Sequence, residues 1–444
     1  MKPNTTEQPP VPAPKRWLNR NILGMGLASL FSDMNHEMAS AILPVFLSSV
    51  LGAPAFALGI IEGVADGVST LFELWAGWYS DRIGKRKGLA ALGYFVTAFS
   101  KATFALATNW WHVLFGRTAG WIGWSIRSPV RDALLTESTT PATVGRAFAF
   151  HRTLDTLGAI LGPLIATLLM ARVSLRTIFL VSLIPGLCAF FSIVFLVKER
   201  PRQPNLSPPW LSLKGLPRDF LKFLIPVGLF GVSNFAPTLF ILRAQDLLTP
   251  ASGAAMAGAF AVGLYTFSHV VYALVAYPIG VLSDRTSKRA ILSAGFALFG
   301  LLCLGLIFAD GQKWLLILLF ALNGVYTAII ESSQPALAST LISEHQHGTG
   351  FGLMSAVDGV GDFLSSVTMG VLWTVVSPNA GFIAAGTLAI FSAIMLYSLR
   401  LPKQEGQDAD GLKRGLLKLG QPLGISWQHT DKESKRWIAD LRMF

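Results

Sequence analysis

The sequence predicts an all-α membrane protein with twelve transmembrane helices, arranged as two pseudo-symmetric six-helix bundles. The composition supports this fold class, since 52% of the 444 residues are hydrophobic and only 14% are charged. The hydrophobic residues form long stretches, and one crossing of the membrane requires roughly 20 of them. In addition, a motif near position 80 recurs in the second half of the chain, which indicates a duplicated bundle.

The repeated motif closes one apolar stretch and opens the next. Its first copy begins at Gly77, and a step of 203 positions carries Gly77 to Gly280. We interpret Gly77 as a point of close helix approach and Gly84 as the end of the helix. The same step aligns Asp81 with Asp284, Arg82 with Arg285, Gly145 with Gly348, Phe148 with Phe351, Asp155 with Asp358 and Gly158 with Gly361.

The apolar stretches predict twelve spans in two sets. The first set lies near residues 21–48, 55–80, 87–108, 111–134, 145–170 and 174–197. The second set lies near residues 219–246, 253–281, 289–309, 313–341, 347–375 and 379–400. The predicted organisation is a disordered tail (1–20), a first bundle (21–197), a linker (198–218), a second bundle (219–400) and a polar C-terminal tail (401–444).

The formal net charge of +11 arises from lysine and arginine concentrated in alternate connections between the spans. This distribution follows the positive-inside rule and predicts that both termini and the linker face the cytoplasm. The charge is therefore a topology signal and not a nucleic-acid surface. The first twenty residues lack the apolar core of a cleaved signal, so we expect the first span to direct insertion, in bacteria into the cell inner membrane.

No motif in the sequence indicates an enzyme or a bound cofactor. The two cysteines, Cys188 and Cys303, fall inside apolar stretches, so neither a disulfide framework nor a thiol metal site is expected. Nucleotide loops, paired metal-ligand motifs and nucleophile elbows are also missing from the sequence. We expect a monomer whose partners are the lipid bilayer, protons and a small-molecule substrate.

The motif G-x-x-x-D-R-x-G-K-R, which begins at Gly77 and returns at Gly280, resembles the loop signature of the major facilitator superfamily. The second copy has Ser287 in place of the second glycine. The resemblance implies a secondary transporter in which two bundles rock about a central site. It also implies that the loop aspartate, Asp81, latches the cytoplasmic side by meeting Arg127 or Arg131.

Other segments match this superfamily in part. Residues 32–38, 126–133 and 145–155 resemble a branch of poorly characterised bacterial permeases. Arg117 resembles the arginine of the fourth-span signature, with Trp121 where that signature has glycine. Gly158, Gly162 and Pro163 resemble the fifth-span signature of antiporters, and the alternative is that they only let two helices pack closely.

Two acidic stripes lie within the predicted first and second spans. Charged residues at mid-membrane normally face a cavity or the bundle interior. Clustered carboxylates can bind and release a proton near neutral pH, so we assign proton coupling to Asp33, Glu37 and Asp66. The other members of the stripes are His36, Glu62 and Glu73, and of these His36 and Glu62 are candidate substrate ligands.

The second half offers polar and aromatic side chains with little charge. With Arg117, these complete the predicted substrate site and suit a small amphipathic or cationic solute. The candidates are Asn234, Tyr265, His269, Tyr326 and Gln334. A separate set closer to the cytoplasm is expected to form a gate or a structural salt-bridge network, and it comprises Arg127, Arg131, Asp155, Glu331 and Asp358 beside the motif residues Gly77, Asp81, Arg82, Gly84, Gly280, Asp284 and Arg285.

The leading hypothesis is a proton-coupled secondary transporter of a small organic solute, with export preferred. A second hypothesis uses Asp33, His36, Glu37 and Asp66 as ligands for a divalent metal ion that is carried across the membrane. A third is a membrane receptor or scaffold that does not transport, in which the acidic stripes would have no use.

Overall fold

The computed structural model describes residues 17–83, 85–140, 143–199, 216–343 and 347–400, and all regular secondary structure among them is helical. The first half contains α1 (Arg20–Ser49), α2 (Ala55–Ile83), α3 (Lys87–Ala102) with η1 (Thr103–Leu106), α4 (Trp110–Glu137), α5 (Val144–Met170) and α6 (Leu175–Phe191) with η2 (Ser192–Leu196). The second half contains α7 (Arg218–Gly231), α8 (Thr238–Ser252), α9 (Ala254–Arg285), α10 (Lys288–Ile307), α11 (Lys313–Leu341), α12 (His347–Val375) and α13 (Pro378–Ser398).

The step of 203 positions that relates the sequence motifs also relates whole helices. The first residues of α4, α5 and α6 shift by this step onto the first residues of α11, α12 and α13, which are Lys313, His347 and Pro378. Capping residues reinforce the match, because Ser174 accepts a hydrogen bond at the start of α6 and Ser377 does the same for α13. The predicted all-α, two-part architecture is therefore confirmed.

The predicted seventh span, 219–246, is wrong as one continuous helix. The chain leaves helical geometry after Gly231 and resumes at Thr238, so α7 and α8 are separated by a break. Pro237 lacks a backbone N–H and disfavours helical geometry in the residue before it. Serines of α12 pair with backbone groups of the break, since Ser366 Oγ accepts from the N–H of Ala236 at 3.1 Å and Ser365 Oγ donates to the carbonyl of Asn234 at 2.9 Å.

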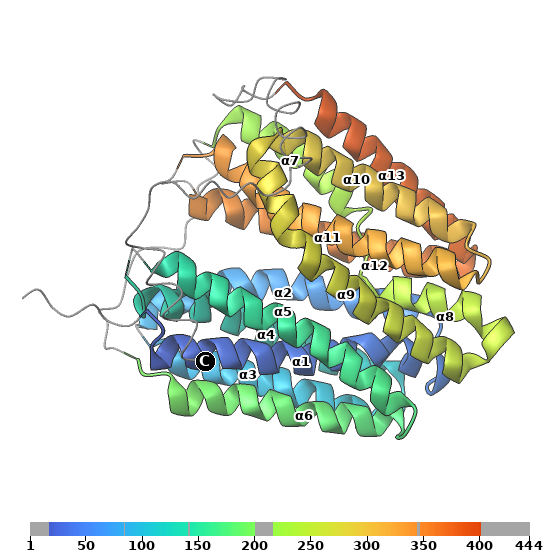
Figure 1. Ribbon diagram of the computed structural model, residues 1–444, viewed down its shortest axis with the longest axis horizontal. Coiled ribbons are helices and arrows are strands. Elements are labelled where there is room, and N and C mark those ends of the chain that lie inside the picture. Colours follow the sequence, from blue (N-terminus) through green and yellow to red (C-terminus); the bar gives the residue numbers. More distant parts are fainter. Residues whose placement is uncertain (1–16, 84, 141–142, 200–215, 344–346, 401–444) are drawn as a thin grey trace, which may run out of the picture.

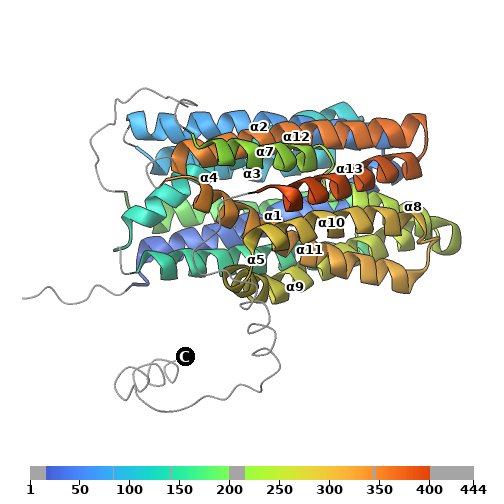
Figure 2. The ribbon, with the colours of Figure 1, turned by 90° about the horizontal axis from the view of Figure 1, so that it is seen from above.

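The helices of each half pack mainly with one another, and a few pairs join the halves (Figure 1). α1 packs on α5 and α6 in the first half, while α10 packs on α13 and α9 on α11 in the second. α2 lies along α12, as Figure 2 shows, and α5 meets α9. α1 and α2 scarcely touch, although only a short turn joins them, because α2 packs between α4 and α12.

Glycines allow the closest contacts between helices. A Cβ atom added to Gly158 of α5 would lie 2.3 Å from the carbonyl oxygen of Leu30 in α1. On the surface between the halves, a Cβ added to Gly63 of α2 would lie 2.8 Å from the carbonyl oxygen of Phe363 in α12. Gly77 was expected at such a contact, but its nearest neighbour would be Pro129 Cβ at 3.9 Å.

Eight helical segments among the described residues are long and apolar enough to cross a membrane. α1, α4 and α12 are equally long, with 30, 28 and 29 residues, yet fall outside this group. All three carry charged or polar residues, including Glu37 on α1, Arg117 on α4 and Asp362 on α12, that line a cavity between the halves. Their low hydropathy thus reflects a polar face turned away from lipid. The number of crossings stays a prediction.

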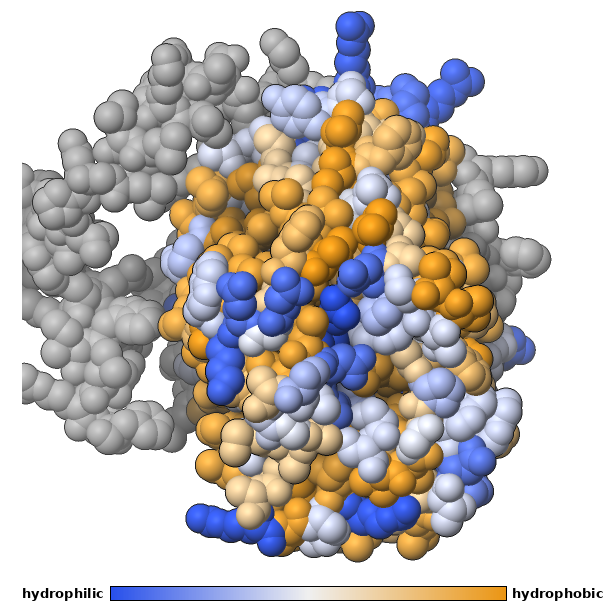
Figure 3. Space-filling model, turned by 90° about the vertical axis from the view of Figure 1, so that its right-hand side faces the viewer, coloured by the Kyte–Doolittle hydropathy of each residue, from blue (hydrophilic) through white to orange (hydrophobic). Residues whose placement is uncertain are grey.

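The halves meet at the end of the molecule that carries the turn of residues 50–54, here called the opposite end. Gln245 of α8 donates to the hydroxyls of Ser48 and Ser49 at 3.1 and 3.2 Å, and Phe56 N donates to Thr374 Oγ1 at 3.0 Å. Figure 3 views this end and shows a cluster of hydrophilic side chains near its middle, surrounded by hydrophobic ones. The other end, called the basic end, carries Lys85 and Arg86 in one turn and Lys288 in another.

Candidate functional site

A cavity of about 330 Å³ lies between the two halves, and it is the candidate substrate site. Helices of both halves contribute to its wall, together with the break between α7 and α8. Its size is within the range of small-molecule pockets, about 300 to 1,000 Å³. Eight predicted ligands or coupling residues line this central cavity: His36, Glu37, Glu62, Asp66, Arg117, Asn234, Tyr265 and Tyr326.

A buried ion pair between α4 and α2 forms one wall. Arg117 Nη2 lies 2.9 Å from Glu62 Oε2, and Arg117 Nε donates to the same carboxylate at 3.0 Å. The third guanidinium nitrogen, Nη1, donates to Ser40 Oγ of α1 at 2.7 Å. Both charged side chains are almost fully buried, so this pair fixes α1, α2 and α4 around the cavity.

Glu37 links the two halves. Tyr265 of α9 donates its hydroxyl to Glu37 Oε2 at 3.0 Å, and His269 Nε2 lies 3.8 Å from the same oxygen. The rings of Tyr265 and His269 meet edge to face at 4.6 Å. His269 is outside the residues that line the cavity and approaches it through Glu37, so its contact with substrate stays a prediction.

The acidic lining extends to a residue that the sequence analysis missed, Asp362 of α12. Asp66 of α2 and Asp362 both line the cavity, one from each half. Asp362 follows Asp358 by four positions, so the spacing that identified the other stripes would have indicated it.

Two further residues of the first half were also missed. Trp121 lines the cavity and packs its ring edge to face against His36 with a centroid distance of 5.1 Å. Lys101 is fully buried on α3, and its Nζ has no hydrogen-bond partner among the described residues. A lone lysine within the apolar stretch 87–108 was the available signal.

The second half provides neutral hydrogen-bonding groups at the break. Tyr326 of α11 donates to Asn234 Oδ1 at 2.5 Å, and both side chains line the cavity. Gln334 instead lies closer to the basic end, where Nε2 donates to Asp358 Oδ2 at 2.8 Å. Its assignment to substrate contact is not supported by this position and stays a prediction.

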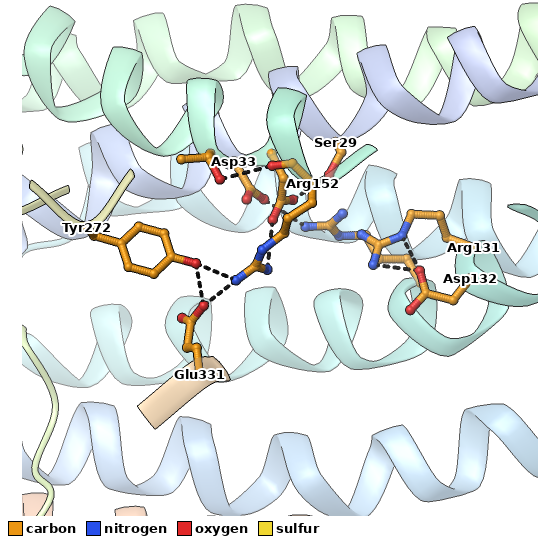
Figure 4. A network of polar contacts seen from close by, with 10 residues as sticks. Ser29, Asp33, Arg131, Asp132, Arg152, Tyr272 and Glu331 are labelled. Carbon is orange, nitrogen blue, oxygen red and sulfur yellow. Dashed lines mark hydrogen bonds and ion pairs between the residues drawn. The ribbon is translucent and has the colours of Figure 1, made fainter. Parts of the chain in front are cut away.

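A polar network joins α1, α5, α9 and α11 on the basic-end side of the cavity (Figure 4). Arg152 of α5 pairs with Glu331 of α11, and it donates to the hydroxyl of Tyr272 in α9 at 2.8 Å. Tyr272 donates in turn to Glu331 at 2.5 Å. Asp155 connects this group to α1, because it lies 3.3 Å from Arg152 Nη1 and accepts from Ser29 at 2.5 Å.

Asp33 belongs to this network and not to the central cavity, which corrects the expectation that it faces the cavity beside Asp66. It lies 3.6 Å from the guanidinium of Arg127, a fully buried residue that also stacks over Tyr94 at 4.5 Å. The carboxyl groups of Asp33 and Asp155 are close enough to share a hydrogen bond, which connects Asp33 to the network. Asp33 is one helical turn nearer the basic end than Glu37, and that turn moves its carboxylate out of the cavity.

The remaining members of the predicted gate do not join one cluster. Arg131 pairs with its neighbour Asp132 at 2.9 Å, and Asp358 bonds to Gln334. In the motif turns, Arg82 lies over the ring of Trp78 at 5.3 Å, and Asp284 lies 3.8 Å from Lys288. Gly84 and the side chains of Asp81 and Arg285 lie outside the described part of the structure, so the latch stays a prediction.

Among the residues that the structure describes, no three histidine, cysteine, aspartate or glutamate side chains are placed to hold a metal ion. Cys188 and Cys303 are both free thiols. The charged groups of the site instead form ion pairs and hydrogen bonds between helices.

Paired halves, a polar cavity between them and charged contacts that cross from one half to the other define a polytopic membrane transport protein. The family model described as Major Facilitator Superfamily matches residues 25–268 and, in a second alignment, residues 223–434. An uncharacterized MFS-type transporter of Methanocaldococcus jannaschii is 33% identical over 384 residues, which cover 86% of this chain and 95% of that relative. The chain belongs to the major facilitator superfamily.

More distant relatives and solved structures agree. The multidrug resistance protein MdtG of Escherichia coli is 24% identical over 415 residues, with 88% of this chain and 97% of the relative covered. The crystal structure of the nucleoside transporter NupG is similar with a TM-score of 0.71 at 12% identity, covering 86% of this chain and 100% of that chain. A POT family transporter in complex with 5-aminolevulinic acid has a TM-score of 0.69 at 13% identity, covering 85% and 95%. These structures show a shared fold.

Proposed function

We propose that the chain is a proton-coupled secondary transporter that exports an amphipathic organic cation by alternating access. The observation that carries this proposal is the charge balance of the central cavity. Among the described residues that line it, the only arginine is Arg117, which is already paired with Glu62. The carboxylates in the lining are Glu37, Glu62, Asp66, Glu331 and Asp362. Glu331 is paired with Arg152, so Glu37, Asp66 and Asp362 form the excess over the paired charges.

This excess of carboxylates attracts a cation, and the aromatic side chains around it stabilise the apolar part of the same solute. Trp121 and Tyr326 supply two such aromatic faces. Export as the direction is supported by the relative named multidrug resistance protein, although the two chains are only 24% identical. The proton is proposed to bind Asp33, Glu37 or Asp66.

We also propose that the protein acts as a monomer in the cell inner membrane with its basic end and both termini in the cytoplasm. α1 begins and α13 ends at the same end of the helical bundle (Figure 1), which supports termini on one side. Lys85, Arg86 and Lys288 at this end support its cytoplasmic placement.

The test is transport in liposomes that contain the purified full chain and a pH gradient, with tetraphenylphosphonium as the probe. Glu37→Gln and Asp66→Asn keep the shape of the side chain but cannot release a proton. We expect both variants to lose accumulation driven by the gradient and to retain exchange of probe across the membrane. Asp219→Asn is the matched control, since Asp219 pairs with Lys222 at the basic end, away from the cavity.

Coupling is disproved if Glu37→Gln, Asp66→Asn and Asp33→Asn all leave the pH dependence of transport unchanged. Loss of exchange together with loss of probe binding would make these carboxylates substrate ligands. Full activity in every variant would show that none of the three has either role.

A further inference from the structure

A second cavity, of about 540 Å³, lies between α5, α9 and α11. Its walls come from both halves, with Thr156 and Leu157 on α5 facing Ala273 and Ala276 on α9. Most of this side cavity is lined by alanine, leucine, threonine and tyrosine, so it is far less acidic than the central cavity.

The side cavity opens onto the apolar flank of the molecule. Leu157 on its rim begins a stripe of exposed leucines that continues along α5 at Leu161, Leu164 and Leu168. The spacing of three and four residues places this stripe on one face of the helix, which is the face that lipid covers. On α9 the rim residue Tyr277 is 81% exposed. A solute could therefore enter this cavity from the bilayer.

Charged side chains lie at the end of the side cavity that is nearest the central cavity. Arg152, Tyr272 and Glu331 all line it, and Arg152 contacts both Tyr272 and Glu331. Glu331 also lines the central cavity, so this one carboxylate faces both spaces. Arg152 lies eight residues, or about 12 Å, along α5 from the first residue of that helix.

Arg152 has an alternative partner if it leaves Glu331. Asp155 lies 3.3 Å from Arg152 Nη1 on the same helix and is held in place by Ser29. A cationic group that enters the side cavity can therefore replace the guanidinium at Glu331 without leaving Arg152 unpaired. Such an exchange conserves charge at both carboxylates and joins the two cavities.

We propose that the side cavity is a lateral access site for an amphipathic cation dissolved in the membrane, which places its apolar part between α5 and α9 and its charged group at Glu331. This inference rests on the proposed function and adds the path by which the substrate arrives. A hydrophilic cation is excluded from this path, because entry from lipid would transfer its charge into hydrocarbon at a high free-energy cost.

Filling the side cavity tests the path. Ala276→Trp adds an indole inside the cavity, at a residue that does not line the central cavity. Leu274→Trp is the matched control, because Leu274 is on the same helix, 70% exposed and outside the cavity lining. We expect Ala276→Trp to slow transport of tetraphenylphosphonium about tenfold through steric exclusion, and to leave transport of tetramethylammonium unchanged. Leu274→Trp should affect neither ion.

Equal slowing of both ions, or of neither, would overturn the lateral path. A second measurement does not depend on transport, namely photolabelling of the full chain in lipid nanodiscs by a long-chain alkylammonium that carries a diazirine. Labelling of the α5 and α9 lining residues that is lost in Ala276→Trp supports the site. Labelling that is found only outside these residues overturns it. If the lining residues are labelled but the protein transports neither ion, the proposed function is refuted and the binding site is established.

Discussion

At Glu62 and Arg117, two opposite charges are removed almost completely from solvent and bonded at two points. Ser40 satisfies a further nitrogen of the guanidinium, so the pair is well compensated inside the protein. A buried charge that loses its partner is expensive, whereas removal of both charges is tolerated much better. The contribution of this pair is therefore visible only when single and double substitutions are compared.

We expect Glu62→Leu alone to destabilise the protein by about 3 to 5 kcal/mol, because it leaves Arg117 buried without its carboxylate. The double variant Glu62→Leu with Arg117→Met should recover a large part of this loss. Thermal unfolding in detergent micelles, followed by helical circular dichroism, measures both. If the single variant unfolds at the same temperature as the unmodified chain, the pair has no structural importance.

Residue spacing alone predicted most of the acidic wall, but it could not predict partners. Glu37, Glu62 and Asp66 were placed correctly because intervals of three and four residues define one helix face. The pairing of Asp33 with Arg127 depends on how α1 and α4 are rotated against each other, which periodicity does not fix. Lys101 was missed because a single charge forms no pattern.

Among the helices, α5 shows how glycine positions set the distance between two elements. Gly158 and Gly162 face α1, and added Cβ atoms would lie 2.3 and 2.7 Å from the carbonyl oxygens of Leu30 and Met34. Side chains at these positions would collide with backbone, which cannot move aside easily. This contact explains why the two glycines occur in α5 without any reference to the direction of transport.

Gly158→Ala should lower stability by about 1 to 3 kcal/mol, since overpacking against the α1 backbone outweighs the better helix propensity of alanine. Gly145→Ala, on the same helix with no atom within 4 Å of the added Cβ, is the matched control and should be neutral or slightly stabilising. The yield of monodisperse protein and its unfolding temperature report the difference. Equal behaviour of the two variants would contradict the packing explanation.

The break between α7 and α8 could not be recognised from hydropathy, because the sequence on both sides of it is apolar. Only Pro237 and the polar Asn234 signal it, and proline is common in membrane helices that remain continuous. What makes the break possible is the pair Ser365 and Ser366 on α12, which bond to its backbone. Those partners are about 130 positions away in the sequence.

On the scale of the whole molecule, the contacts between the halves are unevenly distributed. Hydrogen bonds at the opposite end involve Ser48, Phe56 and Gln245, and the network of Arg152 and Glu331 lies deeper. Between the halves, the structure also describes a hydrogen bond from Tyr265 to Glu37 at the central cavity. A Cβ added to Gly77 would meet only Pro129 Cβ, at 3.9 Å, and one added to Gly280 would meet no described atom within 4 Å. We interpret the conformation as closed at the opposite end, and we expect the motif turns to meet their partners in the other conformation.

A disulfide across the opposite end tests this interpretation. A Cβ added to Gly258 of α9 would lie 3.6 Å from Val45 Cβ of α1, close to the typical separation of about 3.8 Å in disulfides. In a chain with Cys188→Ser and Cys303→Ala, the pair Val45→Cys and Gly258→Cys should therefore cross-link on oxidation. Because alternating access requires this end to open, we expect the oxidised protein to lose transport in liposomes and to regain it on reduction, while each single cysteine variant is unaffected by oxidation. An oxidised, fully cross-linked protein that still transports would show that the halves need not separate between Val45 and Gly258.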